Sequence, residues 1–190
     1  MILMGNNGSG KSTFINYILG FYTSSNQHPF LKDFSQHFKP LKQDEFGYSP
    51  EIAMLDNNLS AADYIKSVSS FRNSEVKSSP LLKRVTLEIS PKTAIREYSK
   101  GMKQRLSLIL AMIGNPKYLV LDEPTSGLDR FGANLIINIL KEEKENYKYI
   151  ISTHSSKLAI ELGDEIWLFK KGKIVKKFIP KDVKELESFL

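Results

Sequence analysis

A run of eight residues near the start of the chain has the composition and spacing of a phosphate-binding loop. Residues 5–12 read GNNGSGKS and satisfy the pattern G-x-x-x-x-G-K-[ST] in full. Glycines let the backbone turn tightly enough to aim successive N–H groups at phosphate oxygens. The Lys11 ammonium would reach the β- and γ-phosphates, and the Ser12 hydroxyl would ligate Mg²⁺. The predicted nucleotide-binding residues are Gly5, Asn6, Asn7, Gly8, Ser9, Gly10, Lys11, Ser12 and Thr13.

The segments on either side of this loop are those that such a loop requires. Residues 2–4 (ILM) are apolar and fit the end of a buried strand. Residues 13–19 continue as a helix that Gly20 would end. The N-terminus of that helix would point its dipole at the bound anion. Strand, loop and helix together predict a nucleotide site.

Two adjacent carboxylates follow a second apolar run. Residues 118–121 (YLVL) are typical of a parallel strand that is covered on both faces. Ligands of open α/β sheets gather at the carboxyl ends of the strands, so Asp122 is expected beside the phosphates, where it can hold Mg²⁺. Glu123 comes next and can orient and polarise the attacking water as a general base.

Four further short motifs occur in order along the chain. They are GYSPE at residues 47–51, YSKGMKQRL at 98–106, SGLD at 126–129 and STHS at 152–155. With the phosphate loop, this ordered set resembles the nucleotide-binding domain of ABC ATPases over nearly the whole chain. The resemblance implies that the protein hydrolyses ATP to ADP and phosphate, with Mg²⁺, and that Lys11, Glu123 and His154 are its catalytic residues.

The resemblance also assigns a role to each motif. The signature, which in this family serves the γ-phosphate held by a second subunit, would comprise Ser99, Lys100, Gly101 and Met102. Its serine and glycine stand at the start of an apolar helix, whose orphan N–H groups and dipole favour an anion. SGLD would be the D-loop with Asp129, and His154 would contact the γ-phosphate and the attacking water. Glu51 occupies the Q-loop position and could reach Mg²⁺, together with Ser12 and Asp122.

The implied fold class is α/β: a P-loop NTPase core with a mostly parallel sheet, plus an inserted α-helical subdomain. We expect one ABC ATPase domain over residues 1–190. Its parts would be the core at 1–50 and 115–178, the helical and signature part at 51–114, and a C-terminal helix at 179–190.

Several segments carry local structure signals. Helices are predicted at 60–71 behind a serine cap, near Pro80, and at 130–147, where residues 135, 136, 139 and 140 form an apolar face. Residues 170–172 (KKG) predict a hairpin turn. No strand can be assigned between residues 21 and 44, although family members usually have a hairpin there.

Two departures from the family pattern bear on function. Lys100 and Met102 replace a common glycine and glutamine, and Glu51 stands where most members have glutamine. These substitutions resemble a subgroup of exporters of drugs, lantibiotics, lipids and polysaccharides. Only four residues precede the phosphate loop, too few for the usual N-terminal β-subdomain with its adenine-stacking aromatic. Our hypothesis is an N-terminally shortened chain that binds nucleotide about 5- to 150-fold more weakly, since base stacking is worth about 1–3 kcal/mol.

The amino-acid composition and the net charge bear on several classes of protein and partner. Hydrophobic residues make up 41% and charged residues 25%, as in globular domains, and cysteine is absent, which excludes disulfides and thiolate metal sites. No apolar run approaches about 18 residues. The net charge of +6 is concentrated partly in the lysine-rich segment 170–184, which lacks the interleaved aromatics of a nucleic-acid platform. No direct nucleic-acid partner is therefore expected.

The leading hypothesis is the ATPase subunit of an ABC exporter. Its partners would be a second ABC ATPase subunit, in a homodimer or heterodimer, and a polytopic membrane permease subunit. The protein would then be cytoplasmic and peripheral on the inner face of the cell membrane. Two alternatives stay open: a soluble ABC ATPase acting on DNA or ribosomes, and a non-catalytic nucleotide-binding remnant.

Overall fold

The computed structural model describes residues 1–22 and 29–179. Its strands are β1 (Ile2–Met4), β2 (Phe46–Ser49), β3 (Tyr118–Asp122), β4 (Lys148–Ser152), β5 (Ile166–Lys170) and β6 (Lys173–Phe178). Its α-helices are α1 (Lys11–Ile18), α2 (Leu31–His37), α3 (Ala61–Phe71), α4 (Ser78–Arg84), α5 (Lys100–Met112), α6 (Arg130–Glu142) and α7 (Ser156–Leu162). A short 3₁₀ helix, η1 (Ile95–Glu97), precedes α5.

The strands form one six-stranded sheet in the order β2-β3-β4-β1-β5-β6. All neighbouring pairs are parallel except β5–β6, which is the antiparallel hairpin predicted at the KKG turn. The carboxyl ends of β1, β3 and β4 therefore meet at one edge of the sheet. The prediction of an α/β, mostly parallel P-loop fold is confirmed.

Alternating residues of the central strands face two separate hydrophobic layers. Leu3, Val120 and Ile150 pack with α1 and α2. Their neighbours on the same strands, such as Leu121 and Ile151, pack with α5, α6 and α7 on the other face. Both faces are covered, which explains why these strands read as continuous apolar runs.

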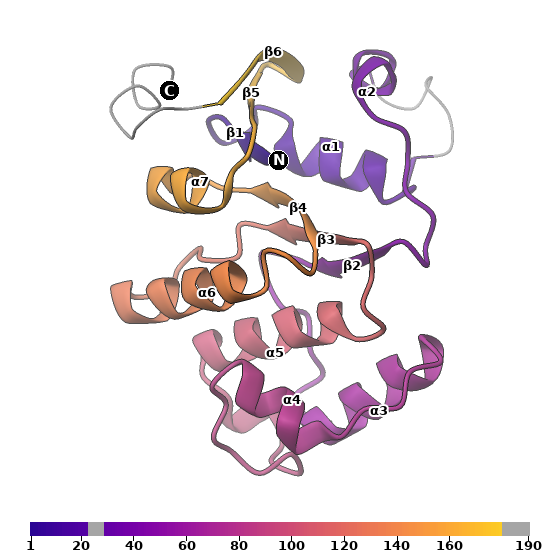
Figure 1. The fold of residues 1–190 in the computed structure, drawn as a ribbon, viewed down its shortest axis with the longest axis vertical. Coiled ribbons are helices and arrows are strands. Elements are labelled where there is room, and N and C mark those ends of the chain that lie inside the picture. The colour runs from indigo at the N-terminus through magenta and orange to yellow at the C-terminus, as the bar shows by residue number, and fades with distance from the viewer. Residues whose placement is uncertain (23–28, 180–190) are drawn as a thin grey trace.

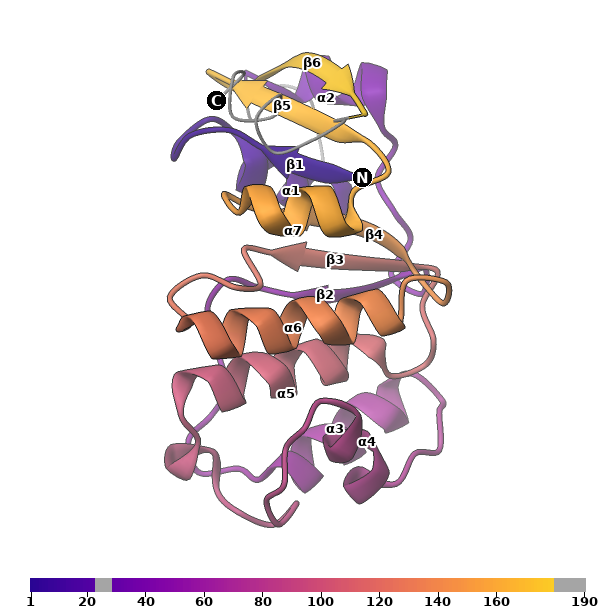
Figure 2. The same ribbon diagram turned by 60° about the vertical axis from the view of Figure 1, so that its left-hand side comes forward.

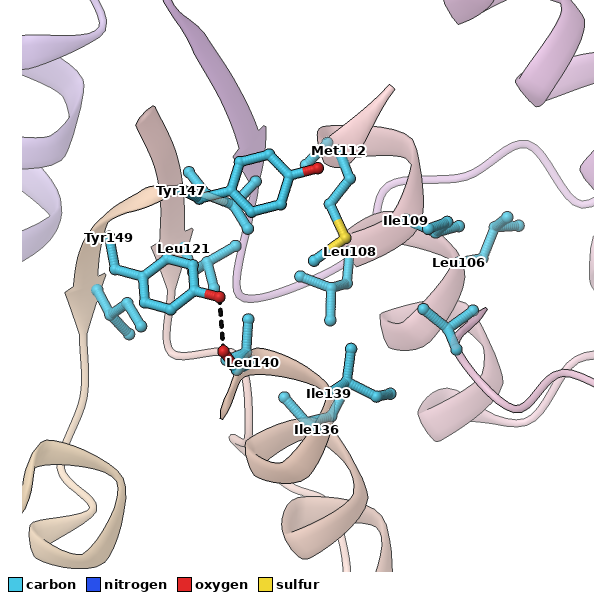
Figure 3. Packing of buried hydrophobic residues seen from close by; sticks show 14 of the residues in the cluster. Leu106, Leu108, Ile109, Met112, Leu121, Ile136, Ile139, Leu140, Tyr147 and Tyr149 are labelled. Carbon is cyan, nitrogen blue, oxygen red and sulfur yellow. Dashed lines mark hydrogen bonds between the residues drawn. The ribbon is translucent and has the colours of Figure 1, made fainter. Parts of the chain in front are cut away.

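The second layer is the larger of the two and continues into the helical part of the chain. Figure 3 shows residues of α5, α6 and β3 converging there, with the Tyr149 hydroxyl donating to the Leu140 carbonyl oxygen at 2.6 Å. In Figures 1 and 2, α3 and α4 lie at one end of the molecule, and α2, β5 and β6 lie at the other. In the chain, α3, α4 and α5 are inserted between β2 and β3.

Some local predictions are confirmed and one is wrong in extent. Ser60 caps α3 in a capping box with Asp63, and Pro80 lies in the first turn of α4. The helix expected over 130–147 ends at Glu142, because the chain must turn back before β4 begins at Lys148.

Segment 21–44, where no strand could be assigned, contains helix α2 within its described part. The C-terminal helix predicted at 179–190 lies outside the described residues beyond Ile179. Within residues 1–22 and 29–179, no helix is long and apolar enough to cross a membrane.

The close approach of α5 to β2 gives a first testable prediction. A Cβ atom on Gly47 would lie 1.7 Å from the Ala111 carbonyl oxygen, so Gly47→Ala must push the helix off the sheet. We expect the free energy of unfolding in urea to fall by about 1–3 kcal/mol, the usual cost of overpacking.

The same substitution at Gly101 is the matched control. Gly101 lies in α5, and a Cβ atom there meets only Leu128 Cδ2 at 3.7 Å. Gly101→Ala should leave the protein as stable or up to about 1 kcal/mol more stable, because glycine weakens helices. Equal stability of the Gly47→Ala variant and the wild type would contradict the packing described here.

Candidate nucleotide site

The phosphate loop lies between β1 and α1, where its glycines allow close backbone contacts. Gly10 has φ +108°, a conformation that other residues rarely adopt. A Cβ atom on Gly5 would lie 2.3 Å from the Phe169 carbonyl oxygen, so only glycine fits against β5. The loop thus brings its backbone to the N-terminus of α1, as the sequence pattern predicted.

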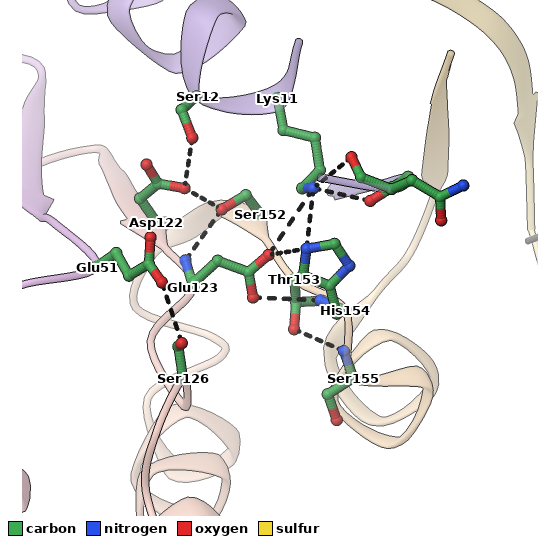
Figure 4. A network of polar contacts seen from close by, with 12 residues as sticks. Lys11, Ser12, Glu51, Asp122, Glu123, Ser126, Ser152, Thr153, His154 and Ser155 are labelled. Carbon is green, nitrogen blue, oxygen red and sulfur yellow. Dashed lines mark hydrogen bonds and ion pairs between the residues drawn. The ribbon is translucent and has the colours of Figure 1, made fainter. Parts of the chain in front are cut away.

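The Lys11 side chain is buried beneath this loop. Its Nζ atom donates to the Gly5 carbonyl oxygen at 2.8 Å and lies 3.9 Å from Glu123 Oε1 (Figure 4). The same Nζ is 3.2 Å from His154 Nε2. Burial lowers the pKa of Lys11, and the carboxylates of Glu123 and Asp122 act in the opposite direction. The ammonium is therefore held where a phosphate group could replace its present partners.

These contacts define the state of the histidine ring. An ammonium can only donate, so a hydrogen bond from Lys11 to His154 Nε2 is made with the neutral ring whose proton is on Nδ1. Burial, and next the charge of Lys11, lower the pKa of His154 below its ordinary value. Geometry and electrostatics agree on a neutral imidazole.

Glu123 has an unusual backbone and a poorly satisfied carboxylate. Its φ is +46°, which is uncommon for a residue other than glycine and is typical of functional sites. Glu123 Oε2 accepts from the His154 backbone N–H at 3.2 Å, whereas the buried Oε1 has no hydrogen-bond partner despite lying 3.1 Å from His154 Nε2. Burial raises the pKa of Glu123, and Lys11 opposes that shift.

Asp122 is buried next to the start of α1. Asp122 Oδ1 accepts from Ser12 Oγ at 3.4 Å and from Ser152 Oγ. Hydroxyl and carboxylate oxygens this close can ligate one Mg²⁺, whose bonds to oxygen are about 2.0–2.1 Å long. No cluster of three or more His, Cys, Asp or Glu side chains in the described residues could hold a metal alone. The pair therefore fits an ion whose other ligands are phosphate and water.

Ser152 is a site residue whose role the sequence did not predict. Besides Asp122, it contacts the backbone of Glu123, whose N–H lies 2.9 Å from Ser152 Oγ. Asp122 and Ser152 are directly paired across β3 and β4. In the sequence, only the position of Ser152 at the start of the STHS motif, at the end of an apolar run, indicated that it could belong to the site.

One cavity is lined by several of these groups. It has a volume of about 300 Å³, and its lining includes phosphate-loop residues, Glu123 and His154. Glu51 and Ser126 also line it, and Ser126 Oγ donates to Glu51 Oε1 at 3.0 Å. The structure thus brings the predicted phosphate loop, carboxylates, Q-loop and histidine together.

The predicted signature and D-loop residues have other neighbours. Ser99 caps α5 by accepting from the Met102 N–H at 3.2 Å, and Asp129 caps α6 by accepting from the Gly132 N–H at 2.7 Å. The Lys100 ammonium lies against Gly127, where an added Cβ atom would be 2.0 Å away. The described lining of the cavity includes none of residues 99–102 and not Asp129.

The fold is that of an ABC nucleotide-binding domain, and comparison with known proteins establishes the family. The family profile described as "ABC transporter" matches residues 1–126. The chain therefore belongs to the ABC transporter family, whose ATP-binding domains are ATPases.

Two relatives of known name are similar to this chain over most of its length. The chain is 34% identical over 175 residues to the lantibiotic transport ATP-binding protein SrtF of Streptococcus pyogenes, a match covering 91% of this chain and 76% of that protein. It is 28% identical over 180 residues to the phospholipid-transporting ATPase ABCA3 of Rattus norvegicus, covering 91% of this chain. The matched part is only 10% of that larger relative.

Solved structures agree on the fold. An ATP-binding subunit of an ABC transporter superposes with a TM-score of 0.74 at 23% identity, covering 98% of this chain and 81% of that one. An ATP-binding cassette in a dimeric post-hydrolysis state with ADP and Pi also gives 0.74, at 20% identity, covering 94% and 84%.

The contact between Lys11 and His154 predicts a measurable pKa change. In an NMR titration, the His154 ring should titrate below 6.5, and Lys11→Met should raise its midpoint because the variant removes a positive charge that disfavours the imidazolium. The midpoint should stay below 6.5, since burial remains. The His154→Gln variant identifies the resonance. A wild-type midpoint at or above 6.5, or one insensitive to Lys11→Met, would contradict the described contact.

Proposed function

We propose that this chain is the ATP-binding and ATP-hydrolysing subunit of an ABC exporter, and that it powers transport through a separate membrane subunit. The observation that carries the proposal is the convergence of Lys11, Glu123 and His154 at the phosphate loop, within 4 Å of one another. We propose that residues 1–190 form one ABC ATPase domain, whose core with the sheet comprises residues 1–50 and 115–178.

Lys11 explains how the site would receive a triphosphate. Its ammonium now contacts the Gly5 carbonyl oxygen and His154 and lies near Glu123. A γ-phosphate entering the cavity would replace these contacts with charge-assisted hydrogen bonds, which are stronger than neutral ones. Ser12 and Asp122 would hold Mg²⁺, which when bound neutralises phosphate charge. Backbone N–H groups of the loop would bind the remaining phosphate oxygens.

Glu123 would accept the proton of the attacking water. Its Oε1 is buried without a hydrogen-bond donor, and burial raises its pKa, which makes the carboxylate a better proton acceptor. The neutral His154 ring beside it would orient the water and the γ-phosphate. Glu51 of the Q-loop, which accepts from Ser126, would couple this site to the membrane partner.

A second ABC ATPase subunit would complete the site. The signature residues Ser99, Lys100, Gly101 and Met102 do not line the cavity of their own chain. We infer that they serve the γ-phosphate bound to the other chain of a homodimer or heterodimer, with Asp129 of the D-loop at the contact between the chains.

A polytopic permease is the proposed membrane partner. The segment between Glu51 and α3 exposes Ile52 (69%) and Met54 (90%), apolar side chains that a helix of a membrane subunit could cover. The proposal of export rests on Glu51, Lys100 and Met102 and on the similarity to SrtF, named for lantibiotic transport. The chain would act on the cytoplasmic face of the membrane.

Removing the proposed base tests the function. Glu123→Gln keeps the size of the side chain but cannot accept a proton at that position. We expect steady-state phosphate release from Mg-ATP to fall by about 10²- to 10⁴-fold, the usual contribution of general base catalysis, while ATP still binds.

Glu161→Gln is the control for this assay. Glu161 pairs with Lys141 and Lys157 on the surface, so its loss should leave the rate of phosphate release unchanged. Equal rates for the wild type and the Glu123→Gln variant would refute the assigned role, and no release by the wild type would refute hydrolysis by this chain.

A further inference from the structure

Two buried polar side chains of α5 contact the end of β2. Gln104 is 4% exposed and Ser107 is 6% exposed, whereas the other buried residues of this helix are apolar. A buried polar group costs free energy unless it is hydrogen-bonded. Gln104 Nε2 donates to the Pro50 carbonyl oxygen at 3.3 Å, and the Ser107 and Ser49 hydroxyl oxygens lie 2.8 Å apart. These two contacts join α5 to the chain just before Glu51.

The two contacts differ in what else holds their partner on the β2 side. Ser49 is the last residue of β2 and is paired with Leu121 of β3, so the sheet already fixes its position. Pro50 lies beyond the end of the strand, and residues 50–59 form neither helix nor strand. The hydrogen bond from Gln104 therefore reaches the chain at the point where regular structure ends.

Glu51 extends into the nucleotide site from this irregular segment. It is exposed and lines the phosphate-loop cavity, where its Oε1 accepts from Ser126 Oγ at 3.0 Å (Figure 4). Ile52, which follows it, is 69% exposed. An exposed side chain outside helix and strand depends for its position on the few contacts that it and its backbone neighbours make. For Glu51 these include Ser126 at the carboxylate and Gln104 at the preceding carbonyl group.

The Glu51 carboxylate acts electrostatically on the groups beside the phosphate loop. Burial lowers the pKa of His154, the charge of Lys11 lowers it further, and the charge of Glu51 opposes both. Burial also lowers the pKa of Lys11, and Glu51 is one of three carboxylates that act in the other direction. Interactions between charges depend on their separation. A displaced Glu51 would therefore change the charge balance at His154 and Lys11.

We propose that Gln104 is a positioning residue for Glu51, a role that rests on the proposed ATP hydrolysis. By donating to the Pro50 carbonyl oxygen, Gln104 holds the backbone from which Glu51 reaches the cavity. Removing that donor frees this backbone and leaves the phosphate loop as it is. Helix α5 would then act on the nucleotide site of its own chain through Gln104, in addition to presenting its first turn to a second chain.

A double-mutant cycle tests whether Gln104 acts through Glu51. Gln104→Met keeps the length of the side chain and removes the donor. We expect it to lower kcat for Mg-ATP hydrolysis by about 2- to 12-fold, the rate ratio that corresponds to one hydrogen bond. Glu51→Ala should lower kcat at least as much. In the Glu51→Ala background, Gln104→Met should have no further effect, because the residue through which it acts is absent.

Ser107→Ala is the matched control. It removes the neighbouring polar contact between α5 and β2, but its partner Ser49 is held by the sheet. The variant should unfold at a lower urea concentration than the wild type and keep the wild-type kcat. An equal loss of kcat in the Ser107→Ala and Gln104→Met variants would overturn the proposal. Independent effects of Gln104→Met and Glu51→Ala would also overturn it, because Gln104 would then only support the fold.

A second measurement does not require hydrolysis. The chain has no cysteine, so Ile52→Cys provides a single thiol next to Glu51 for a nitroxide spin label. In the electron paramagnetic resonance spectrum, Gln104→Met should make this label more mobile, and Ser107→Ala should not. Unchanged mobility in the Gln104→Met variant would refute the positioning role. A wild type that releases no phosphate would instead refute the proposed function, and the spectra would still decide whether Gln104 holds this segment.

Discussion

The parallel pairing of β1 with β4, and of β4 with β3, is the constraint on which the site depends. Leu3 and Asp122 are both paired with Ser152, so the ends of the three strands are held side by side. The phosphate loop leaves β1 at this edge, and Glu123 and His154 leave the other two strands. Backbone ladders, buried on both faces, thus position groups that are more than a hundred residues apart in the chain.

Charge balance at this edge explains the local geometry. Lys11 is buried, which lowers its pKa. Its ammonium contacts the Gly5 carbonyl oxygen and the His154 ring and lies near the Glu123 carboxylate. Glu123 is in turn left with one oxygen that has no donor. Lys11 and Glu123 therefore present an ammonium and a carboxylate oxygen to the cavity, the groups that in our proposal would contact a triphosphate and a water molecule.

Local patterns were enough to predict β1, β3, the phosphate loop and the capped helix α3, because their signals lie within each segment. They were not enough to predict α2. Its N-cap residue makes no side-chain cap, and the helix is held by packing of Phe34 on Phe14. The hydrogen bonds of Ser152 and the hydrogen bond from Gln104 to Pro50 likewise join distant segments. These features depend on contacts between residues far apart in the chain, so they could not be predicted from any short segment of the sequence.

The signature at the start of α5, which we propose serves the γ-phosphate bound to a second chain, does not line the cavity of its own chain. The most direct test of a shared site is the solution mass of the Glu123→Gln variant, measured by light scattering with and without Mg-ATP. Blocked hydrolysis should trap two chains around ATP, so the mass should double only with nucleotide. A variant that binds Mg-ATP and keeps the mass of one chain would contradict a site completed by a second copy.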